Sequence, residues 1–229
     1  MAKPLDLEEQ EQLDELKHFW KQYGNPITWV LIVVLAGVAS WNGWNYWQRT
    51  QAAQASVLFD EVERAIQSGE AARVERALTD IRDKFGRTTF AQQAQLLGAR
   101  FLHENGKPEV ARSALTWVAD KASDDGYQAI ARLRLAAVLL DTKQYDDALA
   151  RLAAPFPAAF TALAADRRGD VLTAQGKSAE ALAAYQAAYA GLDARSEYRR
   201  MVEVKLNALG VDPQANANQA VPAAPTEVK

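Results

Sequence analysis

The side chains in this sequence with the strongest potential for chemistry are two histidines and two pairs of adjacent aspartates. His18 and His103 lie far apart, and neither has a second histidine nearby with which to share a metal ion. Neighbouring aspartates on a helix point about 100° apart, so neither pair forms an acid–base couple. The sequence also lacks a glycine-rich phosphate loop and a serine in a nucleophile elbow. We therefore expect a protein that is not an enzyme and that needs no cofactor or metal.

These polar residues have simpler expected roles at helix ends. Asp124 and Asp125 precede a predicted helix and suit capping, while Asp146 and Asp147 suit a solvated first turn. His103 comes at the end of another predicted helix, where it would interact with the terminal carbonyl groups. With catalysis set aside, the surfaces of the fold become the candidates for function.

A repeat of about 33 residues organises the C-terminal part of the chain. Gly169, Leu172, Gly176, Ala181, Tyr185 and Ala188 have the same spacing as Ala136, Leu139, Lys143, Ala148, Leu152 and Pro155. A third copy starts at Gly98, and a degenerate fourth copy predicts helices over 52–67 and 71–85 around a turn at Ser68-Gly69. Small residues let paired helices cross closely, and glycines end the first helix of each pair. The final helix, from Ser196 to Leu209, would cover the last repeat.

This spacing resembles the tetratricopeptide repeat, in which pairs of antiparallel helices stack because one pair cannot bury its apolar face alone. In that family the first helix of each unit lines a concave groove. The resemblance therefore implies a partner-binding groove, or alternatively a face packed against the capping helix or a neighbouring unit. The implied groove residues are Gln92, Gln95, Ala99 and Leu102, then Ile130, Leu133, Ala137 and Leu140, and finally Asp166, Asp170 and Thr173.

Five of the six tryptophans surround the longest apolar run, which extends from Ile27 to Ala39. No charged residue occurs between Lys21 and Arg49, and residues 27–47 would reach roughly 31 Å as a helix, enough to cross a bilayer. Indole rings favour the membrane–water boundary. We expect a membrane-spanning helix, whereas a cleaved signal peptide would need a basic start and a shorter core. The small residues Ala36, Ser40, Ala39 and Gly43 could contact another membrane helix.

The predicted fold is thus all-α: a single N-terminal transmembrane helix followed by a tetratricopeptide-like α-solenoid. Its parts are an acidic head (1–25), the span (26–47), the repeat domain (48–211) and a disordered tail (212–229). Gly24-Asn25-Pro26 should separate a helix in the head, capped by Asp6 and Glu9, from the span. Lys17 and Lys21 outweigh Arg49, which favours a cytoplasmic N-terminus and a periplasmic repeat domain. Residues 49–229 are formally neutral, which argues against nucleic-acid binding.

Three short segments resemble the YfgM family, the ancillary subunits of the bacterial Sec translocon with a periplasmic tetratricopeptide-like domain: Trp20-Lys21 with Gly24-Asn25, Gly43-Trp44-Asn45-Tyr46-Trp47, and Lys205-Leu206-Asn207-Ala208-Leu209. The resemblance implies an inner-membrane protein that associates with the translocon. It also implies transfer of emerging, unfolded polypeptide clients to periplasmic folding factors, including a membrane-anchored chaperone. An alternative is an envelope-stress regulator whose cytoplasmic head binds a response regulator.

Overall fold

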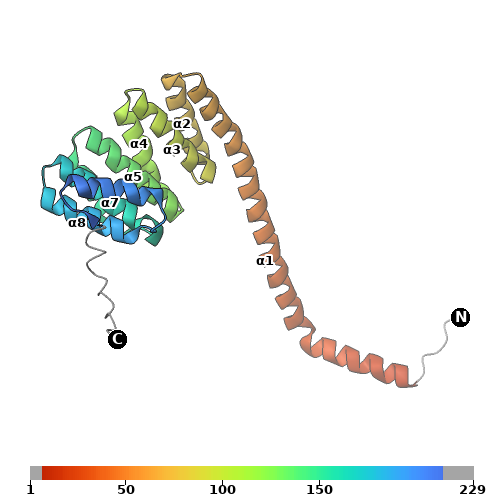
Figure 1. Cartoon of the computed structure of the whole chain (residues 1–229). Coiled ribbons are helices and arrows are strands. Elements are labelled where there is room, and N and C mark those ends of the chain that lie inside the picture. Colours follow the sequence, from red (N-terminus) through yellow and green to blue (C-terminus); the bar gives the residue numbers. More distant parts are fainter. Residues whose placement is uncertain (1–6, 214–229) are drawn as a thin grey trace, which may run out of the picture. The chain divides into compact units, whose positions relative to one another are not determined.

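The computed structural model describes residues 7–213, and within them the secondary structure is helical throughout. Figure 1 shows one long helix followed by a stack of shorter helices. The helices are α1 (Leu7–Gln67), α2 (Ala71–Phe85), α3 (Thr89–Glu104), α4 (Pro108–Lys121), α5 (Asp125–Asp141), α6 (Tyr145–Ala153), α7 (Ala158–Ala174), α8 (Ser178–Gly191) and α9 (Glu197–Ala208).

The chain divides into two compact units between Ala53 and Gln54. The first unit holds most of α1, and its apolar residues are exposed; examples are Val33 and Trp41, at 66% and 69%. This helix is long and apolar enough to cross a membrane, and its most apolar window buries nothing inside the protein. Ala36, Ala39, Ser40 and Gly43 are all exposed along it, so their contact with another membrane helix stays a prediction.

The expected helix break at Gly24-Asn25-Pro26 is wrong, because α1 continues through Pro26. Proline removes one backbone donor, and its ring crowds the preceding turn, so a proline inside a helix bends it. Figure 1 shows this bend in the red-to-orange part of α1. Thr28 Oγ1 also donates to the carbonyl of Gly24 at 2.7 Å, a bond that favours bending. Asp6 of the expected cap lies outside the described residues.

The second unit is the predicted stack of helical pairs. The end of α1 with α2, then α3 with α4, α5 with α6 and α7 with α8 form successive hairpins, and each helix packs against its neighbours in the stack. One continuous apolar core runs from Val62 on α1 to Val171 on α7. A second core joins α7 and α8 to α9 through Leu172, Tyr185 and Leu206. Residues 214–229 of the expected disordered tail lie outside the described part of the chain.

One left-handed residue closes the first helix of every hairpin. Gly69, Gly106 and Gly176 have φ of 75°, and Lys143 takes the same place in the third hairpin with φ of 61°. The repeat alignment matched Lys143 to Gly176, and the left-handed backbone at both positions confirms this match. Gly169 shows why small residues recur at the helix crossing: a Cβ there would lie 2.4 Å from the ring of Tyr185 on α8.

Candidate functional site

The polar residues singled out for chemistry have structural roles. Asp124 Oδ1 accepts from the backbone N–H of Tyr127 at 3.0 Å, so Asp124 caps α5 as expected. Contrary to our expectation, His103 does not bond the terminal carbonyl groups of its own helix. Its Nε2 instead lies 2.9 Å from Asp141 Oδ2 on α5. Among residues 7–213, no group of three or more histidines, aspartates or glutamates could hold a metal ion.

The predicted groove residues on α3 are buried, so this part of the prediction is wrong. Gln92, Gln95, Ala99 and Leu102 are each at most 2% exposed. Gln95 Nε2 donates to the backbone carbonyl of Leu78 on α2 at 2.6 Å. A glutamine in a helical pattern usually indicates an exposed position. A side-chain amide can nevertheless be buried when its hydrogen bonds are made within the protein.

The open side of α3 lies one or two positions further along the helix. Gln93 and Leu97 are half-buried there, and Arg100 is exposed. Gln93 Nε2 donates to the hydroxyl of Tyr127 on α5 at 2.7 Å, which ties the open sides of the two helices together. The sequence signal for this shift was the one-residue slip of the repeat at Asn105-Gly106.

On α5 the predicted residues do reach the surface. Ile130, Leu133, Ala137 and Leu140 are all half-buried and form a stripe along one side of the helix. Three of them pack partly against the core, and the rest of each side chain faces solvent. We call these four residues the α5 stripe.

Arginines recur at the repeat spacing on the first helices of three hairpins. This pattern was not identified from the sequence. Arg100, Arg134 and Arg167 lie on α3, α5 and α7. Arg134 Nη1 donates to the carbonyl of Leu96, one turn before Arg100. Burial and the positive charge of Arg100 lower the pKa of Arg134 below its ordinary value. Arg134 therefore adds positive charge beside the α5 stripe, while Arg100 pairs with Glu104 and Arg167 pairs with Asp170.

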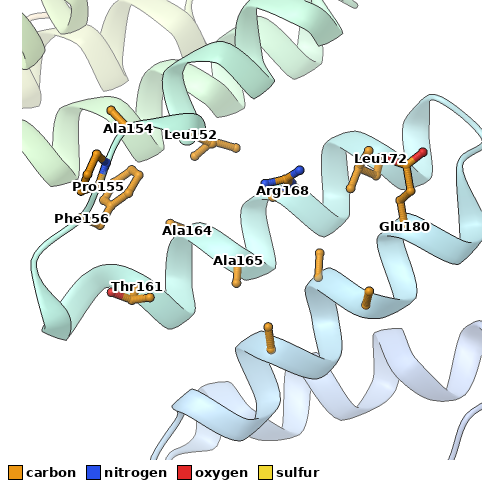
Figure 2. A pocket seen from close by; sticks show the side chains of 13 residues that line it. Leu152, Ala154, Pro155, Phe156, Thr161, Ala164, Ala165, Arg168, Leu172 and Glu180 are labelled. Atoms are coloured by element: carbon orange, nitrogen blue, oxygen red, sulfur yellow. The ribbon is translucent and has the colours of Figure 1, made fainter.

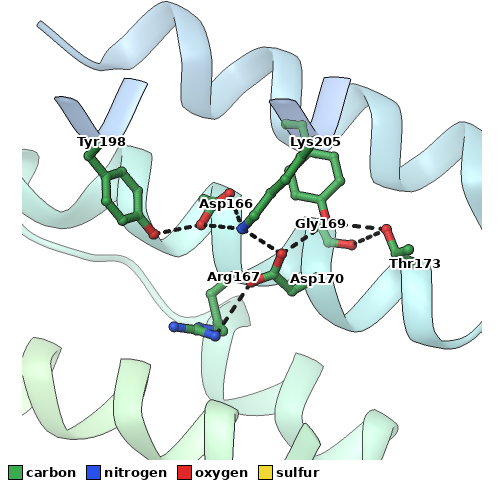
Figure 3. A network of polar contacts seen from close by, with 8 residues as sticks. Asp166, Arg167, Gly169, Asp170, Thr173, Tyr198 and Lys205 are labelled. Atoms are coloured by element: carbon green, nitrogen blue, oxygen red, sulfur yellow. Dashed lines mark hydrogen bonds and ion pairs between the residues drawn. The ribbon is translucent and has the colours of Figure 1, made fainter. Parts of the chain in front are cut away.

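On α7, two predicted groove residues hold the last helix in place (Figure 3). Asp166 is 1% exposed, and both its carboxylate oxygens accept from Lys205 Nζ of α9, at 2.8 and 2.9 Å. The hydroxyl of Tyr198 donates to Asp166 at 2.6 Å. Lys205 also bonds Asp170 at 2.6 Å. Helix α9 thus covers Asp166 and Asp170. This arrangement is the alternative in which predicted groove residues pack against the capping helix.

Thr173, the last predicted groove residue, is exposed but belongs to the same network. Its Oγ1 donates to the carbonyl of Gly169 at 2.9 Å and lies 3.2 Å from the hydroxyl of Tyr185, which in turn donates to Asp170. Burial raises the pKa of both Tyr185 and Tyr198 far above the ordinary tyrosine value. These tyrosines are held as neutral donors to carboxylates.

A separate apolar cavity of about 520 Å³ lies between α6, α7 and α8 (Figure 2). It exists because α6 has only 9 residues, against 14 in α4 and α8, and leaves part of α7 and α8 uncovered. Arg132 does not line the cavity but contacts Pro155 and Phe156, which do: it donates to the carbonyls of Arg151 and Pro155, and its guanidinium lies 3.8 Å from the Phe156 ring centroid. The floor is formed by small side chains, including Ala183, Ala184 and Ala187.

Comparison with known proteins supports the same architecture. Residues 17–211 match the family described as tetratricopeptide repeat-like domain. Three relatives named "Ancillary SecYEG translocon subunit" are similar to most of the chain. The one from Neisseria gonorrhoeae is 34% identical, with 89% of this chain and 98% of the relative covered. The one from Haemophilus influenzae is 30% identical over the same shares, and the one from Escherichia coli is 28% identical, covering 89% and 97%. With the one apolar span found in residues 7–213, the chain is a single-pass inner-membrane protein and belongs to the family of ancillary SecYEG translocon subunits, built on a tetratricopeptide repeat-like domain.

Proposed function

We propose that this protein is an accessory subunit of the Sec translocon that holds polypeptides or a chaperone beside the channel, through the open side of its repeat domain. Its relatives carry the name of translocon subunits and match nearly the full chain, which supports the association. An accessory subunit needs a binding surface and no reaction, which fits the structural roles of His103 and Asp124.

The α5 stripe is the observation that carries this proposal. Ile130, Leu133 and Leu140 present half-buried apolar surface in the middle of the repeat stack, where a partner could complete their burial. Arg134 stands beside them, and its only hydrogen bond shown in the described part of the chain is to the Leu96 carbonyl. An unfolded segment offers apolar side chains and carboxylates together, so its chemistry fits this surface.

Orientation belongs to the same proposal. Lys17 and Lys21 lie close to the start of the span, and Arg49 is the first basic residue after it. Lysine and arginine near a span favour the cytoplasmic side, so the N-terminus would be cytoplasmic and the repeat domain periplasmic. On that side the repeat domain would bind translocated clients or a membrane-anchored chaperone.

The test is site-specific photocrosslinking in cells from Leu133 and Ala137, with Ser113, an exposed residue of α4, as the control position. We expect adducts with translocating polypeptides, a chaperone or the channel from the first two positions and few from Ser113. Leu133→Ser should reduce the adducts from Ala137 several-fold. Leu182→Ser, a half-buried leucine of α8, controls for general destabilisation. Equal crosslinking from the stripe and from Ser113 would reject the stripe as the binding surface.

A further inference from the structure

The head part of α1 carries an apolar face that the described part of the chain leaves uncovered. Leu13, Leu16, Phe19, Trp20 and Tyr23 are between 40% and 62% exposed. Among residues 54–213 of the second unit, by comparison, the exposed large apolar residues are Val57, Met201 and Val204. Five such side chains within eleven positions form a concentrated apolar surface on a segment outside the apolar span.

These five side chains lie on one side of the helix. At about 100° per residue they fall within an arc of roughly 120°, the width typical of an amphipathic face. Ile27, at the start of the span, falls in the middle of the same arc. The opposite side carries Glu11, Asp14, Glu15, His18 and Gln22. The apolar face of the head is therefore continuous with the surface that enters the membrane.

Pro26 lies at the junction between this face and the span. Figure 1 shows a bend in the red-to-orange part of α1. A straight helix would carry the five side chains away from the bilayer into water. A bend at the membrane boundary instead lets the head run along the bilayer surface with its apolar side inward. Trp20 packs over Gly24, where a Cβ would lie 3.1 Å from the indole, so this ring is held next to the bend.

The residue types match the interfacial region. Tryptophan and tyrosine combine an apolar ring with a preference for the headgroup level, and phenylalanine and leucine are typical of the buried face of interfacial helices. By the same helical angles, Lys17 and Glu15 each lie about 40° outside an edge of the apolar arc, and Lys21 lies beside Asp14 on the polar side. Lys17 pairs with Asp14 at 2.9 Å, and its long stem allows the amino group to reach lipid phosphates. The carboxylate of Glu11 points away from the arc. We propose that residues 13–23 form an interfacial helix that lies on the bilayer, with Leu13, Leu16, Phe19, Trp20 and Tyr23 among the lipids and the acidic side toward water.

The absence of cysteine from the chain makes a direct test simple. Single cysteines are introduced in the full-length protein as neighbouring pairs, Phe19→Cys with His18→Cys and Tyr23→Cys with Gln22→Cys, and are labelled with a nitroxide. The protein is placed in vesicles of phosphatidylethanolamine and phosphatidylglycerol. Accessibility of each label to oxygen, which concentrates in lipid, is compared with accessibility to a water-soluble nickel chelate.

We expect labels at 19 and 23 to be several-fold more accessible to oxygen than to the chelate, and labels at 18 and 22 to show the opposite. The variant Leu16→Glu with Phe19→Glu should give the label at 23 the accessibility of water, whereas Glu15→Gln with His18→Gln should leave it in lipid. Similar access to the chelate at all four positions would overturn the proposal. Protection of 19 and 23 from both reagents would also overturn it, because that result indicates a protein docked on this face.

Discussion

Replacing Asp166 by asparagine should loosen α9 while the rest of the repeat stack keeps its structure. Asp166 is almost completely buried and accepts hydrogen bonds from Lys205 and Tyr198, so it forms the main polar connection between α7 and α9. Removing one partner of a buried ion pair costs about 3–5 kcal/mol. Lys205 retains Asp170 and is 28% exposed, so we expect a cost at or below the bottom of this range, about 2–3 kcal/mol.

Hydrogen exchange of the full-length protein measures this effect at the helix where it should occur. Amides of residues 197–208 should exchange about 30-fold to 150-fold faster in Asp166→Asn, the factor that corresponds to about 2–3 kcal/mol. Amides of α3 to α5 should be nearly unchanged because their core is separate from the one that holds α9. Val202 and Leu206, both 0% exposed, keep α9 loosely associated.

Asp146→Asn is the matched control, because this exposed carboxylate accepts a single bond from Gln175. Its effect should stay below about 0.5 kcal/mol. If Asp166→Asn leaves exchange in 197–208 unchanged, the apolar contacts alone hold α9 and our reasoning about the polar connection is wrong. Faster exchange throughout the stack would equally contradict it, since α9 would then be part of one cooperative unit.

Three further predictions concern the repeat domain. Lys143→Gly should raise the free energy of unfolding by up to about 1 kcal/mol in urea denaturation, because φ is 61° there; a loss of stability would contradict the strain argument. Gly169→Ala should lower the melting temperature, with a cost of about 1–3 kcal/mol from the clash with Tyr185, whereas Gly37→Ala, with nothing within 4 Å, should not. Burial and the Asp166 carboxylate raise the pKa of Tyr198, so its contribution to stability is complete below pH of about 10 and declines as the pH rises further. Tyr198→Phe should flatten that alkaline decline in a pH series of thermal melts, and an unchanged slope would exclude Tyr198 as its source.

Local pattern was enough to predict the helical pairs. The alignment of Lys143 with Gly176 identified a turn position from spacing alone, and both residues are left-handed. The same alignment explained Gly169, whose lack of a side chain admits the Tyr185 ring. Such features depend on residues close in sequence, where period and residue type constrain the backbone directly.

The surface was harder to predict because burial depends on residues distant in sequence. Asp166 and Asp170 have the composition of a solvent-facing stripe, and only the position of Lys205, far along the chain, shows that they are covered. Gln95 is polar and yet buried because a carbonyl on α2 accepts from it. At Pro26 the local sequence was misleading in another way. Gly24-Asn25-Pro26 predicts the end of a helix, but α1 continues through Pro26 with a bend.

The polar connection under α9 also limits how the repeat array could grow. A repeat added after α8 would place the first helix of the new hairpin where α9 now lies. That helix would need its own cation and hydroxyl for Asp166, or it would enclose this carboxylate without counter-charge at a cost of several kcal/mol, whereas Asp170 keeps Arg167 and Tyr185. An ordinary repeat packs against its neighbours through apolar side chains. Its duplication therefore does not supply the required cation and hydroxyl. Asp166 on α7 therefore acts as a length determinant, and lengthening the array requires its replacement first.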